Sequence, residues 1–259
     1  LVCWARRDTG ARAGRLRAEF TAMIRGIFVC GTDTGVGKTR VAAALLRGLA
    51  ADGIRAIGMK PVASGIEPGA EWNEDVLALR AASDAAAVKA ARPEDLNPYA
   101  FVPAIAPHLA SAQAGSTIDI HVIDAAARRL AAGGSAVVVE GAGGALVPLS
   151  SRSDMLDIAV ALRLPVLLVV GVRLGCINHA LLSALAIRTR GLMLSAWVAN
   201  RIDPTMAEAD ANVATLERAL AAPLLADLPW SNSANALPIA GLARMMGWSG
   251  IQMSADEAP

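Results

Sequence analysis

The sequence predicts a single α/β domain built on a doubly wound, mostly parallel β-sheet. Apolar runs alternate with helical patterns along the chain, and the runs at 136–139 and 166–170 are apolar at every position. Strands of this kind are expected where helices cover both faces of a parallel sheet. A glycine-rich turn at residues 31–39 joins the first apolar run to a helical pattern. With 259 residues, the chain is long enough for one large domain with a sizeable core.

The individual elements follow from apolar periodicity. Strands are predicted at residues 26–31, 54–60, 135–140, 165–171, 193–200 and 223–228. Helices are predicted at residues 38–52, 73–82, 119–132, 154–163, 177–190 and 205–221. The stretch 92–118 is interrupted by Pro and Gly, and we expect a loop insert over the sheet edge there.

Residues 1–25 are set apart from the predicted domain, which spans residues 26–259. They are rich in arginine and show no apolar periodicity. An organellar transit segment and a translated upstream stretch with Met23 as the true start are both open, and the second is favoured. The formal net charge of +1 gives no electrostatic footprint for nucleic acid or a membrane surface.

The cysteines and the hydropathy of the chain indicate the cellular compartment in which it is expected. The three cysteines have no metal-ligand spacing, so we expect reduced thiols in a cytosolic protein. The longest apolar stretch, 164–172, is about half the length that a membrane span needs.

Residues 31–39 (GTDTGVGKT) carry the strongest functional signal. A strand, a glycine-rich turn, Lys-Thr and a helix form a phosphate cradle, in which backbone N–H groups and the helix N-terminus face the phosphates. Lys38 would neutralise them, and the Thr39 hydroxyl can ligate Mg²⁺. The strict pattern would have Gly at position 32, where this chain has Thr32. The fold class is therefore predicted to be P-loop nucleoside-triphosphate hydrolase-like, against the alternative of a chance match in a loop.

Other strand ends also carry polar residues, and ligands bind at such ends in parallel sheets. Lys60 ends the second predicted strand, either as a functional ammonium or as a surface lysine before a turn. Glu140 ends the third, where a carboxylate can support Mg²⁺, and glycines follow it. Asp75 could add a second carboxylate, although an acid at a helix start is also favoured by the dipole.

Two later strand ends complete the set. Residues 171–179 form a further glycine-containing turn, whose free N–H groups could hold a carboxylate or phosphate. His179 within it is expected to lie on a helix face. Residues 200–203 (NRID) resemble the base-reading segment of GTP-binding proteins, in which Asn200 would bond a purine edge and Asp203 could select guanine.

Taken together, the motifs resemble the dethiobiotin synthetase family over roughly residues 26–230. The segments that carry the resemblance are 31–39, 60–65 (KPVASG), 97–99 (NPY), 107–108 (PH), 140–144 (EGAGG), 175–179 (GCINH), 198–200 (VAN) and 229–230 (PW). The resemblance implies that ATP drives CO₂ insertion between two neighbouring amines of 7,8-diaminopelargonic acid, with ADP and phosphate as by-products. A carbamate and its anhydride with phosphate would be intermediates, so catalysis would rest on positioning and charge stabilisation.

The resemblance also implies residue roles. The catalytic group would be Lys38, Lys60 and Thr34. ATP and Mg²⁺ would be the cofactors, with the metal held by Thr39, Asp75 and Glu140. Nucleotide contacts would come from Gly35, Val36, Gly37, Lys38, Thr39, Arg40, Asp75, Glu140, Gly141, Gly143, Asn200, Arg201, Pro229 and Trp230. Substrate contacts would come from Ser64, Gly175, Cys176 and Asn178. The substrate tail would cross a subunit interface, so the resemblance implies a homodimer.

Other classes remain as alternatives. A dimeric partitioning-type P-loop ATPase switch has a similar loop but usually carries a lysine at its start, where this chain has Asp33. An amide-forming synthetase on a corrin-like acid would need a glutaminase domain, for which this chain has no room. A GTPase is supported only by residues 200–203.

Overall fold

The computed structural model describes residues 23–67 and 69–230. Most of the predicted extension, residues 1–22, and the tail beyond Trp230 therefore lie outside the described residues. Two described residues that precede the predicted domain, Ile24 and Arg25, contact it. Ile24 is 8% exposed and belongs to the core, and the backbone oxygen of Arg25 accepts a hydrogen bond from the Val137 nitrogen at 2.9 Å.

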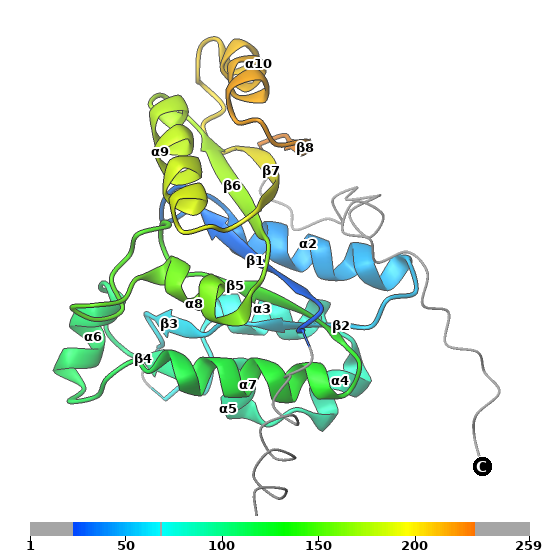
Figure 1. Cartoon of the computed structure of the whole chain (residues 1–259), viewed down its shortest axis with the longest axis vertical. Coiled ribbons are helices and arrows are strands. Elements are labelled where there is room, and N and C mark those ends of the chain that lie inside the picture. The colour runs from blue at the N-terminus through cyan, green and yellow to red at the C-terminus, as the bar shows by residue number, and fades with distance from the viewer. Residues whose placement is uncertain (1–22, 68, 231–259) are drawn as a thin grey trace, which may run out of the picture.

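The main sheet has the strand order β2-β5-β1-β6-β7-β8, and all of its strands are parallel (Figure 1). The strands are β1 (Gly26–Gly31), β2 (Ala56–Met59), β5 (Ala136–Glu140), β6 (Val166–Val172), β7 (Leu194–Arg201) and β8 (Leu224–Leu228). The predicted strands and the doubly wound parallel sheet are thus confirmed. Because β1 lies between β5 and β6, the loop after β1 opens at the point where the chain switches sides, the usual place for a ligand in such sheets.

Helices cover both faces of this sheet (Figure 1). On one face lie α2 (Lys38–Ala51) and α3 (Glu74–Ala82), packed on a core that includes Val29, Val138 and Val169. On the other lie α7 (Ile120–Ala132), α8 (Met155–Leu162) and α9 (Cys176–Thr189), with α10 (Ala209–Ala219) against α9. Every predicted helix is present, with its ends within four residues of the predicted ones.

The prediction of a loop insert at 92–118 is wrong. This stretch holds α5 (Pro93–Leu96), β4 (Tyr99–Phe101) and α6 (Pro107–Gln113), and β4 pairs in parallel with β3 (Val62–Ser64). The short helix α4 (Ala85–Ala90) precedes it. Two of the prolines that indicated breaks instead occupy the first position of a helix, where a missing N–H is harmless.

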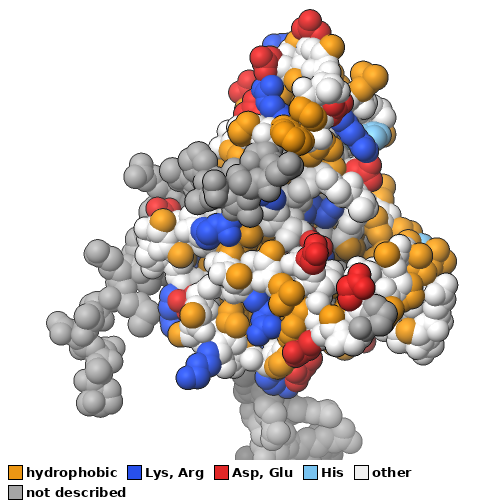
Figure 2. All heavy atoms as spheres, turned by 180° about the vertical axis from the view of Figure 1, so that it is seen from behind, with side chains coloured by type: hydrophobic (Ala, Val, Ile, Leu, Met, Phe, Trp, Pro, Cys, Tyr) orange, Lys and Arg blue, Asp and Glu red, His pale blue; other side chains and the backbone are white. Residues whose placement is uncertain are grey.

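The surface shows no field of one sign on the face in Figure 2, where basic and acidic side chains alternate. Hydrophobic side chains gather there on the lobe that holds α6, which exposes Leu109 and is preceded by exposed Val102 and Ile105. Among the described residues, none of the helices is both long and apolar enough to cross a membrane.

Candidate active site

The loop between β1 and α2 has the geometry of a phosphate cradle. Gly35 and Gly37 adopt left-handed backbone angles, with φ of 74° and 88°, which residues with a Cβ rarely adopt. Gly37 caps α2 at its N-terminus, so the first amides of the helix point into the loop. The Lys38 side chain is buried, and its Nζ donates to the backbone oxygen of Asp33 at 2.9 Å. Burial and the nearby charge of Lys60 hold the pKa of Lys38 below its ordinary value. An anionic ligand in the loop would raise this pKa again, because it favours the charged ammonium.

Asn200 lies directly beneath this loop. A Cβ on Gly37 would stand 2.2 Å from the Asn200 Nδ2 atom, which donates to the Val36 backbone oxygen at 2.8 Å. The Asn200 Oδ1 atom accepts from Arg40 at 3.0 Å, and Arg40 also donates to the Pro229 backbone oxygen at 3.3 Å. The structure thus joins the segments predicted to hold the base to the phosphate loop. Both ends of the Asn200 amide are already engaged there.

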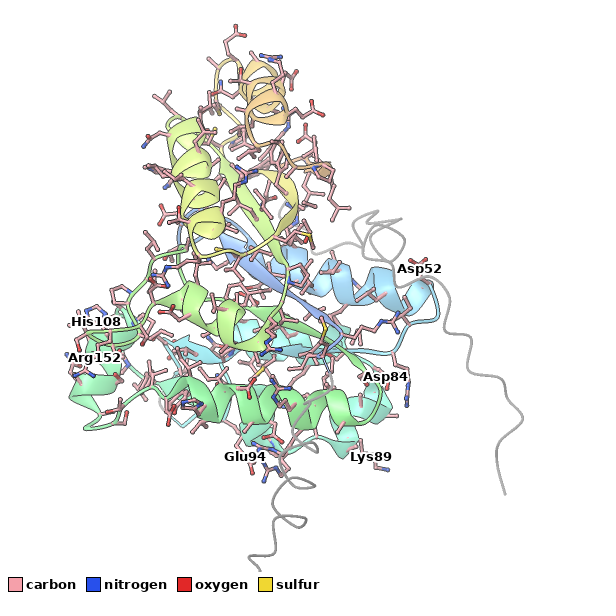
Figure 3. All side chains as sticks on the ribbon, in the orientation of Figure 1. Asp52, Asp84, Lys89, Glu94, His108 and Arg152 are labelled. Atoms are coloured by element: carbon pink, nitrogen blue, oxygen red, sulfur yellow. The ribbon has the colours of Figure 1, made fainter. Side chains whose placement is uncertain are left out.

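Four predicted residues from distant segments meet beside the loop. The Thr39 hydroxyl lies 2.7 Å from Asp75 Oδ1 and 2.8 Å from Glu140 Oε1. The Lys60 ammonium donates to Asp75 Oδ2 at 2.9 Å and to Glu140 Oε1 at 2.6 Å. Of the alternatives open for Lys60, the surface lysine is excluded, because its exposed fraction is 3%. Lys89, by contrast, lies on the outer side of α4 (Figure 3).

Charge pairing dominates the protonation states of this cluster. Burial alone would lower the pKa of Lys60, but the Glu140 and Asp75 carboxylates raise it above its ordinary value. Burial alone would raise the pKa of Asp75, but the Lys60 ammonium and the Thr39 hydroxyl bring it below its ordinary value. Lysine and aspartate therefore both stay charged at neutral pH.

The donor set fits a hard divalent cation. Two carboxylates and a hydroxyl converge, and Glu140 Oε2 is buried without a hydrogen-bond partner, so it has an oxygen lone pair to offer. Among the described residues no group of three or more His, Cys, Asp or Glu could hold a metal. The predicted magnesium site does not need such a group of three, because magnesium commonly takes few protein ligands beside phosphates and water.

Further predicted residues are Thr34 in the loop, Gly141 and Gly143 after β5, and Ser64 at the end of β3. A Cβ on Gly143, whose φ is 64°, would come 3.5 Å from the Thr34 hydroxyl, so the two residues face each other. The Gly141 backbone oxygen lies 3.4 Å from Lys60 Nζ. Ser64, at the end of β3, has a buried hydroxyl without a partner, which leaves it available to a ligand.

The turn before α9 fits only part of its prediction. Gly175 caps the helix with φ 93°, and both it and Asn178 are exposed. Cys176 instead points inward, is 1% exposed and belongs to the core, and its N–H donates to the Arg173 backbone oxygen. Cys176 lies on the buried side of α9 with Ala180 and Ala184, so its side chain is not brought to the turn surface.

The structure does not bring Arg201 and Asp203 to the phosphate loop. Side chains alternate along β7, so Arg201 faces away from Asn200 and pairs with Asp210 and Asp227. The Asp203 carboxylate accepts from the Thr205 nitrogen and hydroxyl in a local turn. Both of these bonds go to the Asp203 Oδ1 atom, so the side chain is held toward Thr205.

Arg173, directly after β6, was not among the predicted site residues. Its guanidinium pairs with the Asp33 carboxylate in the phosphate loop at 2.5 Å. A basic residue directly after a strand was the available signal.

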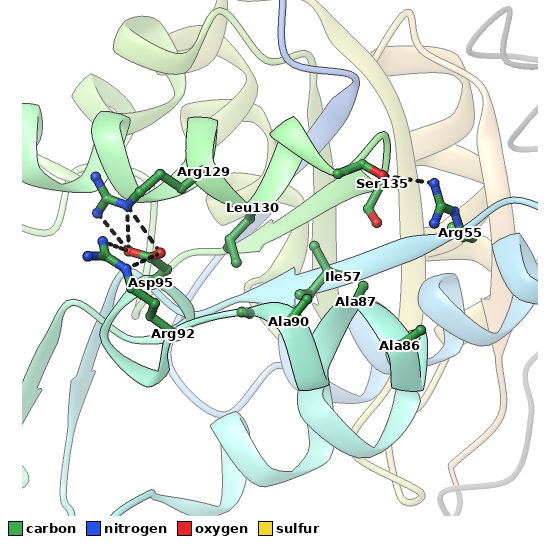
Figure 4. Close-up of a pocket in the computed structure, with 12 residues that line it drawn as sticks. Arg55, Ile57, Ala86, Ala87, Ala90, Arg92, Asp95, Arg129, Leu130 and Ser135 are labelled. Atoms are coloured by element: carbon green, nitrogen blue, oxygen red, sulfur yellow. Dashed lines mark hydrogen bonds and ion pairs between the residues drawn. The ribbon is translucent and has the colours of Figure 1, made fainter. Parts of the chain in front are cut away.

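A cavity of about 340 Å³ lies elsewhere, at the amino-terminal edge of β2 and β5 (Figure 4). Alanines of α4 line it, and at one end Arg92 and Arg129 clamp the buried carboxylate of Asp95. None of the predicted site residues lines this cavity.

The parallel sheet, the phosphate loop and the Lys-Asp-Glu-Thr cluster define a P-loop nucleotide enzyme. A family model described as "AAA domain" matches residues 25–236. The chain is 52% identical over 220 residues to the ATP-dependent dethiobiotin synthetase BioD of Nitrosospira multiformis, covering 85% of this chain and 95% of that protein. The protein of the same name from Aromatoleum aromaticum is 49% identical over 225 residues, covering 86% and 98%. This chain belongs to the dethiobiotin synthetase family, as the motifs predicted.

Solved structures are similar at a lower level. The 54 kDa signal recognition particle protein of Aeropyrum pernix, in complex with GDP, has a TM-score of 0.49 at 16% identity, covering 89% of this chain and 47% of that protein. A ParA family ATPase from Chlorobium tepidum has a TM-score of 0.47 at 12% identity, covering 87% and 97%. The family assignment comes from the sequence relatives.

Proposed function

We propose that this chain closes a cyclic urea from 7,8-diaminopelargonic acid and CO₂ at the expense of ATP, giving dethiobiotin, ADP and phosphate. The single observation that supports this most is the cluster of Lys60, Asp75, Glu140 and Thr39 beside Lys38, at the carboxyl edge of the sheet. Two buried ammonium groups next to a phosphate loop suit a reaction in which a carbamate and a phosphoryl group must approach each other.

The proposed chemistry needs no protein nucleophile. One amine adds CO₂ to give a carbamate, whose oxygen takes the γ-phosphoryl group of ATP while ADP leaves. The second amine then attacks the carbonyl carbon, the C–O bond to phosphate breaks, and the ring closes. The lysines neutralise the charges that would otherwise repel, and the loop amides orient the phosphates. Ser64 would hold the diamine or carbamate end, since its buried hydroxyl has no partner in the protein.

Mg²⁺ would be held by Thr39, Asp75 and Glu140. When bound, it would supply positive charge next to the β- and γ-phosphates. Lys60 would then have to share or leave its carboxylate partners, because the same Glu140 oxygen lies near both the Thr39 hydroxyl and the Lys60 ammonium.

We further propose a homodimer in which the substrate carboxylate meets the turn at Gly175 and Asn178, partly from the second subunit. Support comes from the apolar surface around this turn and along α9. Leu174 is 90% exposed, Leu182 57% and Leu185 62%. Contiguous apolar surface of this kind marks interfaces more often than solvent-facing helices. A cytoplasmic location is part of the proposal, supported by the free thiols of Cys30 and Cys176.

The first experiment measures phosphate release from ATP with Mg²⁺ and bicarbonate, with and without the diamine, and follows the product by mass. We expect release that depends on the diamine and a product heavier than it by CO less two hydrogens. Release indifferent to the diamine would contradict the proposal and favour the partitioning-type ATPase.

A second experiment addresses the metal. Asp75→Asn should require about tenfold more Mg²⁺ for half-maximal turnover, because one of the two carboxylates loses its charge. The exposed Asp52→Asn, at the far end of α2, is the matched control. An unchanged Mg²⁺ requirement in Asp75→Asn would remove this residue from the proposed metal site.

A further inference from the structure

The phosphate loop contains a carboxylate, which is an unexpected charge in a site for a polyanion. Asp33 lies between β1 and α2, and its side chain is 44% exposed. The Lys38 ammonium contacts only the backbone oxygen of Asp33 and leaves its carboxylate to other partners. A bare carboxylate here would repel the phosphates of ATP.

Arg173 supplies the missing positive charge from the neighbouring strand. Its NH2 atom lies 2.5 Å from Asp33 Oδ2, while Asp33 Oδ1 accepts from the Thr34 nitrogen at 2.7 Å. The phosphate loop and β6 are held together close by, because the Gly171 nitrogen of β6 donates to the Thr32 hydroxyl at 3.4 Å. Thr32 and Asp33 on one side and Gly171 and Arg173 on the other thus form two adjacent contacts.

We propose that Arg173 is a positioning residue that neutralises Asp33 and so makes the loop compatible with ATP. The Asp33 side chain shapes the loop by bonding the Thr34 amide, and Arg173 cancels the charge that this bond brings with it. The role of Arg173 is then electrostatic and acts through Asp33. It predicts a specific pattern among variants, because removing the carboxylate should make the guanidinium dispensable.

The test compares ATP dissociation constants, measured by calorimetry with Mg²⁺ and without diamine, for the full chain and its variants. Arg173→Gln should weaken ATP binding about fivefold, as expected for a half-exposed pair near a charged ligand. Asp33→Asn should bind ATP at least as well as the wild type. The double variant should bind ATP better than Arg173→Gln alone, and Arg173→Lys should stay within twofold of the wild type. Raising the salt concentration should shrink the defect of Arg173→Gln, since screening weakens the repulsion.

Arg190→Gln is the matched control. Arg190 is also a partly exposed arginine paired with carboxylates, Asp154 and Asp157, but it lies at the opposite end of α9 from Arg173. The proposal is overturned if Arg173→Gln binds ATP as tightly as Arg190→Gln does. It is also overturned if the double variant binds ATP more weakly than Arg173→Gln, because Asp33 would then contribute to binding in its own right. If the Arg173→Gln and Asp33→Asn variants both melt at the temperature of the wild type, the change in ATP binding does not come from a loss of folding.

Discussion

Replacing Lys60 by methionine should test the charge balance of the buried cluster most directly. Methionine keeps the length and the apolar stem but removes the ammonium between Glu140 and Asp75. Glu140 is 0% exposed, so its carboxylate cannot regain water when its partner is lost. Leaving one member of a buried pair uncompensated destabilises proteins by about 3–5 kcal/mol.

The structure leaves the Glu140 carboxylate few other partners in the variant. Its Oε1 atom would keep the Thr39 hydroxyl at 2.8 Å, and its Oε2 atom has no hydrogen-bond partner. The Asp75 carboxylate would lose the same ammonium, so we expect a loss within the full range for a broken buried pair.

In the wild type, Lys60 and Asp75 should add no pH dependence to the stability between pH 5 and pH 7. The raised pKa of Lys60 gives stability that is fully present below the ordinary lysine value and is lost only as the pH rises through the folded value. The lowered pKa of Asp75 gives stability that is present above the ordinary aspartate value and is lost as the pH falls through the folded one. Neither group changes charge between pH 5 and pH 7.

Urea unfolding of the wild type and of Lys60→Met at pH 5, 6 and 7 measures the difference. We expect a loss of about 3–5 kcal/mol at pH 7. Lys60→Met combined with Glu140→Gln should recover most of the loss, and the exposed Lys89→Met is the control. A loss below about 1 kcal/mol at pH 7 would refute the reasoning that the buried carboxylates depend on the Lys60 ammonium.

Two other substitutions test the loop and the proposed dimer. Gly37→Ala should lose about 3 kcal/mol of stability and most ATP binding, because it combines a left-handed φ with a Cβ 2.2 Å from the Asn200 amide. Gly53→Ala is the control, because Gly53 has the same left-handed φ but no atom within 4 Å of the added Cβ. Thermal unfolding should show a stability loss of about 1 kcal/mol for Gly53→Ala. Equal losses in the two variants would contradict the predicted clash at Gly37. Leu182→Glu should give a monomer by light scattering with ATP binding retained, whereas Leu77→Glu on α3 should leave the mass unchanged. A dimer in Leu182→Glu would place the interface elsewhere.

The sequence by itself determined the strands, most of the helices and the phosphate loop. Apolar runs, periodicity and glycine spacing are local properties, and they act through residues a few positions apart. The same holds for the strand ends, so Lys60 and Glu140 could be recognised as candidates before their positions were known. Local signals failed where a proline is compatible with either a loop or the first turn of a helix. Pro93 and Pro107 were predicted to interrupt the chain, but they begin helices.

Only the tertiary structure decided which of these candidates meet. Lys60 reaches Glu140 because β2 lies next to β5, and Arg173 reaches Asp33 because β6 lies next to β1. Strand order is set by how the helices share the two faces of the sheet, and no local pattern encodes it. The same limit explains Cys176 and Arg201, whose side chains the structure turns into the core and toward Asp227. A motif gives the identity of a residue near the site, and packing against distant segments gives the direction of its side chain.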